Sequence, residues 1–81
     1  MKYDVTIVFK AESNPQEKVR ALEKDLGLSE SFIHVRNIEG HAIDVFDYKL
    51  NRGEVLRVID KFYEIGDVAF VEVHKRWANY V

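Results

Sequence analysis

The sequence predicts an α+β fold in which four antiparallel strands and two helices follow one another in the order β-α-β-β-α-β. Two observations predict this order: apolar residues alternate in four short segments, and they recur at helical spacing in two others. A chain of 81 residues is enough for one domain, so we expect residues 1–81 to form a single unit. With short connections, the order is typical of the ferredoxin-like split βαβ fold, in which two helices cover one face of the sheet.

The first half of the chain is predicted to contain a strand and a helix. Apolar and more polar residues alternate over residues 3–10, which is typical of a strand with one buried face. The apolar set is Tyr3, Val5, Ile7 and Phe9. A helix is expected over about residues 15–26. Asn14 and Pro15 are typical of a helix start, and Gly27 is typical of the left-handed residue that follows a helix.

The second half is predicted to contain a hairpin, a helix and a last strand. Residues 31–37 and 41–48 alternate like the first strand and flank a glycine, so we expect them to pair as a β-hairpin. Asn51 and Glu54 have the spacing of a capping box, and the helix that follows carries an apolar stripe. The stripe comprises Val55, Val58, Ile59, Phe62 and Ile65. Residues 68–74 are rich in Val and Phe and form the last expected strand.

The register of the hairpin determines which of its side chains would line the face of the sheet that the helices leave uncovered. We expect a three-residue loop over residues 38–40, because a two-residue loop would turn the polar side of one strand into the core. In this register His34 lies opposite Asp44, and Phe32 lies opposite Phe46. All four are then expected on the uncovered face.

Three ionisable residues of the hairpin, His34, Arg36 and Asp44, have two interpretations. In the first interpretation, Asp44 pairs with His34 opposite it and with Arg36 on the diagonal, and this ion pairing fixes the register of the hairpin. Such cross-strand pairs contribute roughly 0.2–1 kcal/mol to stability. Alternatively, His34 and Asp44 would form a pH-sensitive or catalytic pair. No third group or nucleophile is evident near them, so we expect no enzymatic activity.

The last strand is expected to add to the same uncovered face. Its alternation predicts that Ala69, Val71 and Val73 face the core and that Val68, Phe70, Glu72 and His74 face outward. Aromatic residues with a charged rim are typical of protein interfaces. We therefore expect a non-catalytic binding module that contacts another protein or a second copy of itself, as a homodimer. The predicted protein-binding residues are Phe32, His34, Arg36, Asp44, Phe46, Phe70, Glu72 and His74.

The third strand resembles one signature of the RNA-recognition motif. The segment "EGHAIDVF" agrees with that signature at Gly40, Ala42 and Phe46, and departs from it at Glu39, Ile43 and Asp44. The resemblance implies an alternative function, which is single-stranded nucleic-acid binding by the sheet face. The residues that would carry it are Arg36, His34, Phe46, His74, Lys75, Arg76 and Trp77. Nucleic-acid-binding proteins usually carry a basic patch, and the net charge of −2 gives no indication of one. Nucleic acid is therefore the less favoured partner.

Two further families share the predicted order of elements. An acylphosphatase-like enzyme would need a glycine-rich phosphate loop with an arginine after the first strand, and "KAESNPQ" has neither. The ACT-type ligand-binding domain works by pairing with a second copy, and no motif here supports or excludes it. A small ligand-sensing or enzymatic domain that uses His34 and Asp44 therefore stays as a third alternative.

Composition and residue spacing exclude several classes of protein and of site. The chain is 47% hydrophobic and 32% charged, as expected of a globular protein, and it has no cysteine for a disulfide or thiolate site. Glu72 and His74 share one strand face, but His34 would lie on the other edge strand, roughly 14 Å away, so we expect no metal and no cofactor. "MKYDVTIVFK" carries Lys and Asp within its apolar run. We expect neither a signal peptide nor membrane contact, and a cytoplasmic location.

Overall fold

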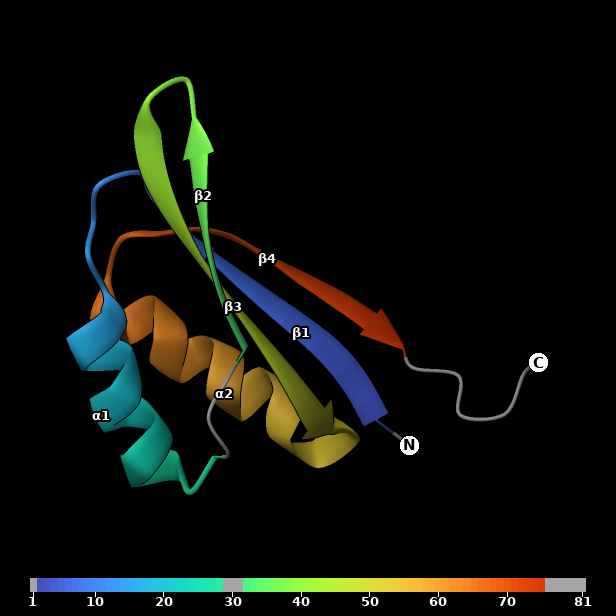
Figure 1. The fold of residues 1–81 in the computed structure, drawn as a ribbon. Helices are drawn as coiled ribbons and strands as arrows, with labels where there is room; N and C mark the ends of the chain where they lie inside the picture. The colour runs from blue at the N-terminus through green and yellow to red at the C-terminus, as the bar shows by residue number, and fades with distance from the viewer. Residues whose placement is uncertain (1, 29–31, 76–81) are drawn as a thin grey trace.

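The structure of the protein is a computed structural model that describes residues 2–28 and 32–75, and it has the predicted order of elements (Figure 1). The elements are β1 (Lys2–Phe9), α1 (Gln16–Leu26), β2 (Phe32–Ile38), β3 (His41–Asn51), α2 (Arg52–Ile65) and β4 (Val68–Lys75). The strands form one antiparallel sheet in the order β2-β3-β1-β4, and both helices lie on one face of it. The ferredoxin-like fold is therefore confirmed.

Neither α1 nor α2, the helices of the described part of the chain, has the length and apolar character that a membrane crossing requires. The helix α1 begins at Gln16, with Pro15 rather than Asn14 in the N-cap position and no side-chain cap, whereas its other end and both ends of α2 form where the sequence predicts. After α1, Gly27 adopts a φ of +68°, which a left-handed position requires and glycine tolerates best. The Leu28 N–H donates to the Glu23 carbonyl at 2.9 Å and the Gly27 N–H donates to the Lys24 carbonyl at 3.3 Å, which is the Schellman pattern.

The start of α2 is held by the predicted capping box. The Asn51 N–H donates to Glu54 Oε1 at 3.0 Å, and Glu54 also places a carboxyl group in the first turn of the helix, where the helix dipole favours negative charge. Val55, Val58 and Phe62 of the predicted stripe are buried against the sheet. The helix therefore covers the sheet with the face that its sequence pattern specifies.

The core between helices and sheet is built around aromatic rings. Phe9 and Phe46 meet edge to face, with ring centroids 5.6 Å apart, and Phe9 also contacts Phe62 at 6.4 Å. Phe46 is fully buried and belongs to this core. The prediction that Phe46 lies on the uncovered face is therefore wrong.

The β2–β3 hairpin explains this correction. Ile38 pairs with His41, so the loop has two residues, Glu39 and Gly40, rather than the predicted three. Both have positive φ, +52° and +81°, as a type I′ turn requires, and such turns match the twist of the paired strands. A shift of one residue moves every side chain of a strand to the other face. Asp44 accordingly lies on the helix side with Phe46 and is 8% exposed.

A bulge near the start of β4 corrects a second prediction. Val8 pairs with Phe70 and Phe9 pairs with Val68, so Ala69 is an extra residue on the β4 side. Val68 consequently packs against the core instead of facing outward, and Ala69 is exposed instead of buried. Beyond the bulge the predicted alternation holds.

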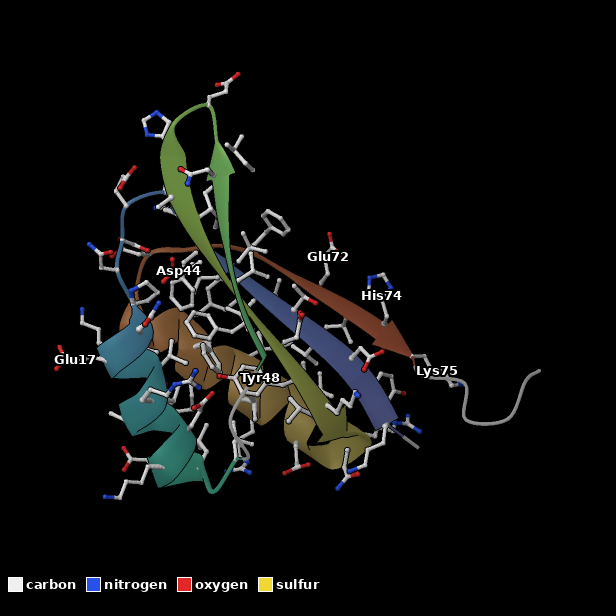
Figure 2. The ribbon with its side chains drawn as sticks, in the orientation of Figure 1. Glu17, Asp44, Tyr48, Glu72, His74 and Lys75 are labelled. Atoms are coloured by element: carbon white, nitrogen blue, oxygen red, sulfur yellow. The ribbon has the colours of Figure 1, made fainter. Side chains whose placement is uncertain are left out.

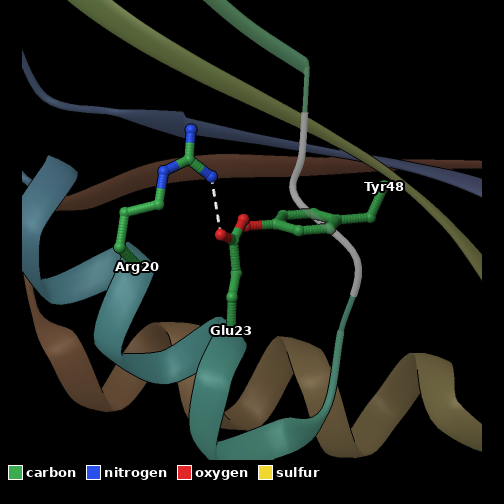
Figure 3. Close-up of polar contacts among 3 residues, drawn as sticks. All are labelled: Arg20, Glu23 and Tyr48. Carbon is green, nitrogen blue, oxygen red and sulfur yellow. Dashed lines mark hydrogen bonds and ion pairs between the residues drawn. The ribbon is translucent and has the colours of Figure 1, made fainter.

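Three polar residues meet beneath α1 (Figure 3). Tyr48 on β3 donates its hydroxyl hydrogen to Glu23 Oε2 at 2.5 Å, and Arg20 Nη1 lies 2.6 Å from Glu23 Oε1. Glu23 is 3% exposed, and the Arg20 guanidinium also lies over the Phe46 ring, 5.9 Å from its centroid. Burying a carboxyl group is costly unless it is paired and hydrogen-bonded, and here it is both.

The β1–α1 loop is joined to the hairpin by Glu12. Its backbone N–H donates to the Ala42 carbonyl at 3.0 Å, and its Oε1 accepts the Ala42 N–H at 3.2 Å. The same carboxylate oxygen lies 3.3 Å from His41 Nδ1. These contacts fix the hairpin relative to the remainder of the sheet.

Candidate functional site

The face of the sheet opposite α1 and α2, which no helix within residues 2–28 and 32–75 covers, is the candidate site, and we call it the outer face. It is defined by side chains from the three neighbouring strands β3, β1 and β4. They are Thr6, Val8, Val45, Asp47, Phe70 and Glu72. Because directly paired residues share a face, the register arranges these six side chains in rows that run across the strands.

One row of the outer face is apolar. Val45, Val8 and Phe70 lie side by side on β3, β1 and β4. Val45 is only 5% exposed, whereas Phe70 is 49% exposed. Ile43 and Ile38, near the tip of the hairpin, continue the apolar surface, and Ile38 is 52% exposed. Together these side chains line a shallow hollow of about 360 Å³.

The next row is polar and closes one end of the hollow. It consists of Asp47, Thr6 and Glu72 on the same three strands. The Thr6 hydroxyl donates to Asp47 Oδ1 at 2.7 Å, which holds that carboxylate against the centre of the sheet. Two carboxylates therefore lie beside the apolar row.

A third row follows, with Lys49, Asp4 and His74 in register. His74 Nε2 lies 3.2 Å from Glu72 Oε2, so the third row is joined to the second along β4. Both side chains point away from the helices (Figure 2). The outer face thus grades from apolar at the hairpin to charged at the opposite end.

Three predicted site residues lie on the outer face as expected: Phe70, Glu72 and His74. Two others do not, because Phe46 and Asp44 are turned toward the helices. Asp44 pairs with Val35 rather than with His34, so the predicted cross-strand pair of His34 and Asp44 is wrong. The backbone register therefore does not place these two residues opposite each other, as both the register ion pair and the catalytic pair require.

Other predicted residues lie partly or wholly outside the described structure. For Phe32, His34 and Arg36 the backbone is described, but the side chains are not. Backbone register pairs these three, in order, with Asp47, Val45 and Ile43. Lys75 is the exposed last residue of β4. Arg76 and Trp77 lie outside the described residues.

Sequence reasoning missed Ile43, Val45 and Asp47, which the structure places on the outer face. The signal that would have found them is the pair Glu39-Gly40. A two-residue loop with glycine in its second position is the commonest hairpin connection, and it places these three residues on the same face as Val8. Among the described residues, no three His, Asp or Glu side chains gather closely enough to hold a metal ion.

Comparisons with known proteins concern the fold. No protein-family model and no curated protein matches the sequence. The solution NMR structure of the ACT domain from GTP pyrophosphokinase of Chlorobium tepidum is similar, with a TM-score of 0.63 over 99% of this chain and 92% of that chain, at 12% identity. An uncharacterized protein from Thermotoga maritima has a TM-score of 0.56 over 89% and 91%, at 19% identity. The chain therefore shares the ferredoxin-like fold with these two proteins.

Proposed function

We propose that the protein is a small non-catalytic binding module that contacts another protein through its outer face. A second copy of the chain is the simplest partner. The observation that carries the proposal is the apolar row with its hollow, in which Phe70 and Ile38 are half exposed on a face without a covering helix. Exposed apolar surface with a polar border is typical of interfaces between proteins.

The polar row supports a protein partner over a nucleic acid. Asp47 and Glu72 lie beside the apolar row, and their negative charges would repel a phosphate backbone. Phe46, one of the residues predicted to carry nucleic-acid binding, is in the core and is not available to a nucleic acid. The similar ACT domain comes from a GTP pyrophosphokinase, and its likeness to this chain supports a small module without assigning a ligand.

The experiment that tests the proposal is sedimentation equilibrium over a wide concentration range. Phe70→Asp and Ile38→Asp each introduce a charge into the hollow from a different edge strand. Leu56→Asp is the matched control, because Leu56 is 75% exposed on α2, on the opposite side of the molecule. We expect both outer-face variants to weaken association about tenfold or more, since anchors at the centre of an interface carry most of its binding energy.

The control variant distinguishes association through the outer face from non-specific association of exposed apolar residues. Leu56→Asp is expected to associate as the wild type does. If all three variants associate equally, or if the wild type is monomeric throughout, the outer face does not bind a second copy. Far-ultraviolet circular dichroism of each variant confirms that the fold is retained.

A further inference from the structure

The strand β4 lies at one edge of the sheet and has a free side. It pairs with β1 on one side, and no strand of residues 2–28 and 32–75 pairs with its other side. An edge strand presents a row of backbone N–H and C=O groups that can pair with another chain. Natural edges are commonly blunted by proline, by being very short or by a bulge. The strand β4 is eight residues long and has no proline, and its bulge at Ala69 comes before the segment from Val71 to Lys75.

The two faces of β4 differ in chemistry, and this restricts how another strand could pair with it. Glu72 and His74 lie on the outer face, whereas Val71 and Val73 lie on the helix side, in register with the core residues of β1. Val73 is 43% exposed although it faces the helix side, because it is at the edge. A partner strand must therefore offer an apolar residue on one face and polar residues of complementary kind on the other.

A second copy of β4 meets this requirement in one antiparallel register. When Val73 lies opposite the partner's Val73, Glu72 lies opposite the partner's His74, and the partner's Glu72 lies opposite His74. The imidazole N–H can donate to a carboxylate whether the ring is neutral or protonated. A shift of two residues in the same orientation would instead place Glu72 opposite the partner's Glu72, which is unfavourable.

We propose that two copies of this chain pair antiparallel along β4, around a two-fold axis at Val73, to form a continuous eight-stranded sheet. Residues that pair directly share a face, so this register keeps all four helices on one side. The two outer faces then lie next to each other on the other side. The edge pairing is made by the backbone of β4 and shares only Glu72 with the hollow of the outer face, so either contact can fail without the other.

A disulfide test reads the register directly, because the chain has no cysteine of its own. Val73→Cys would place two Cα atoms about 4.5–5.5 Å apart across the axis, within the range that a disulfide spans. Lys75→Cys is the control on the same strand, because its two copies would be offset by four residues, about 13 Å along the strands. Under mild oxidation we expect Val73→Cys to form a covalent dimer and Lys75→Cys to remain monomeric on a non-reducing gel.

Equal cross-linking of the two variants, or stronger cross-linking of Lys75→Cys, would overturn the proposed register. Combining Val73→Cys with Ile38→Asp separates this proposal from the preceding one, because Ile38 is on β2 at the other edge of the sheet. The cross-link is expected to survive that combination. Its loss would mean that the chains meet through the outer face and not along β4.

A charge exchange tests the same register without cysteine. His74→Glu places like charges opposite each other at two symmetric positions and is expected to weaken the dimer about tenfold. Adding Glu72→Lys creates two Lys–Glu pairs and is expected to restore dimerisation to at least the wild-type level. Sedimentation equilibrium measures both. A double variant that stays as weak as His74→Glu would contradict the pairing of these residues.

Discussion

Tyr48 on β3 and Glu23 on α1 are hydrogen-bonded in the core, where the tyrosine hydroxyl donates to Glu23 Oε2 at 2.5 Å. The residues lie 25 positions apart in the sequence and join the first helix to a central strand of the sheet. Arg20, also on α1, contacts the other oxygen of the same carboxyl group and lies over the Phe46 ring of β3, so two contacts hold α1 at a defined rotation over the sheet.

Removing the hydroxyl group of Tyr48 should therefore destabilise the fold. A hydrogen bond to a charged group contributes about 1.5–3 kcal/mol, so Tyr48→Phe is expected to lower the free energy of unfolding by about that amount. Urea denaturation followed by circular dichroism measures it. Tyr63→Phe is the control, since Tyr63 is 52% exposed on α2 and should change little. Equal effects of the two substitutions would mean that the buried hydroxyl contributes nothing specific.

Because Phe46 lies in the core and Phe70 on the outer face, replacing them with alanine should cost different amounts of stability. Phe46→Ala removes a fully buried ring and is expected to cost about 3–5 kcal/mol of stability. Phe70→Ala removes a half-exposed ring from the outer face and should cost far less. Thermal and urea denaturation of the two variants give the comparison. If Phe46→Ala cost no more than Phe70→Ala, Phe46 would lie on the outer face, as the three-residue hairpin loop predicts.

The hairpin loop offers a stabilising substitution. Glu39 has a φ of +52°, a conformation that asparagine adopts more readily than glutamate. Glu39→Asn should raise the melting temperature. Gly40→Ala should lower the melting temperature and reduce the free energy of unfolding by about 1–2 kcal/mol, because Gly40 has a φ of +81°. A three-residue loop would not show this pair of opposite effects, since Glu39 would then have no need of positive φ.

The capping box of α2 predicts a loss of stability at the helix start. Asn51→Ala should lower the free energy of unfolding by about 0.5–2 kcal/mol, because the side chain at this position satisfies helix N–H groups. Asp60→Ala, on the same helix but away from its start, serves as the comparison. Asn51→Asp would keep an acceptor oxygen and should retain most of the stability. An equal loss in all three variants would argue against capping.

Local signals in the sequence were sufficient for most of the fold. Periodicity located both helices and all four strands, and Asn51, Glu54 and Gly27 marked helix ends where the structure has them. Each of these signals depends on residues within a few positions of one another. Agreement between local preference and overall fold is what a foldable sequence requires.

The prediction of the hairpin register was wrong because two considerations favoured different loop lengths, and the prediction followed the weaker of them. Avoiding a buried Asp44 favoured a three-residue loop, whereas the twist of paired strands favours a two-residue loop at Glu39-Gly40. The chain accepts an aspartate that is 8% exposed and gains Phe46 for the core. The Glu23–Tyr48 contact was missed because nothing near Glu23 in the sequence indicates a partner on β3.

The central position of β1 has a consequence for how the protein is made. Ile7 pairs with Phe46 on one side and with Val71 on the other, so the strand of this sheet that is synthesised before the other three depends on the third and fourth. Until β4 has emerged, β1 has an open edge and α2 covers an incomplete sheet. Long-range pairings of this kind slow folding and leave strand edges exposed during synthesis. We expect the nascent chain to need protection from aggregation until β4 is translated.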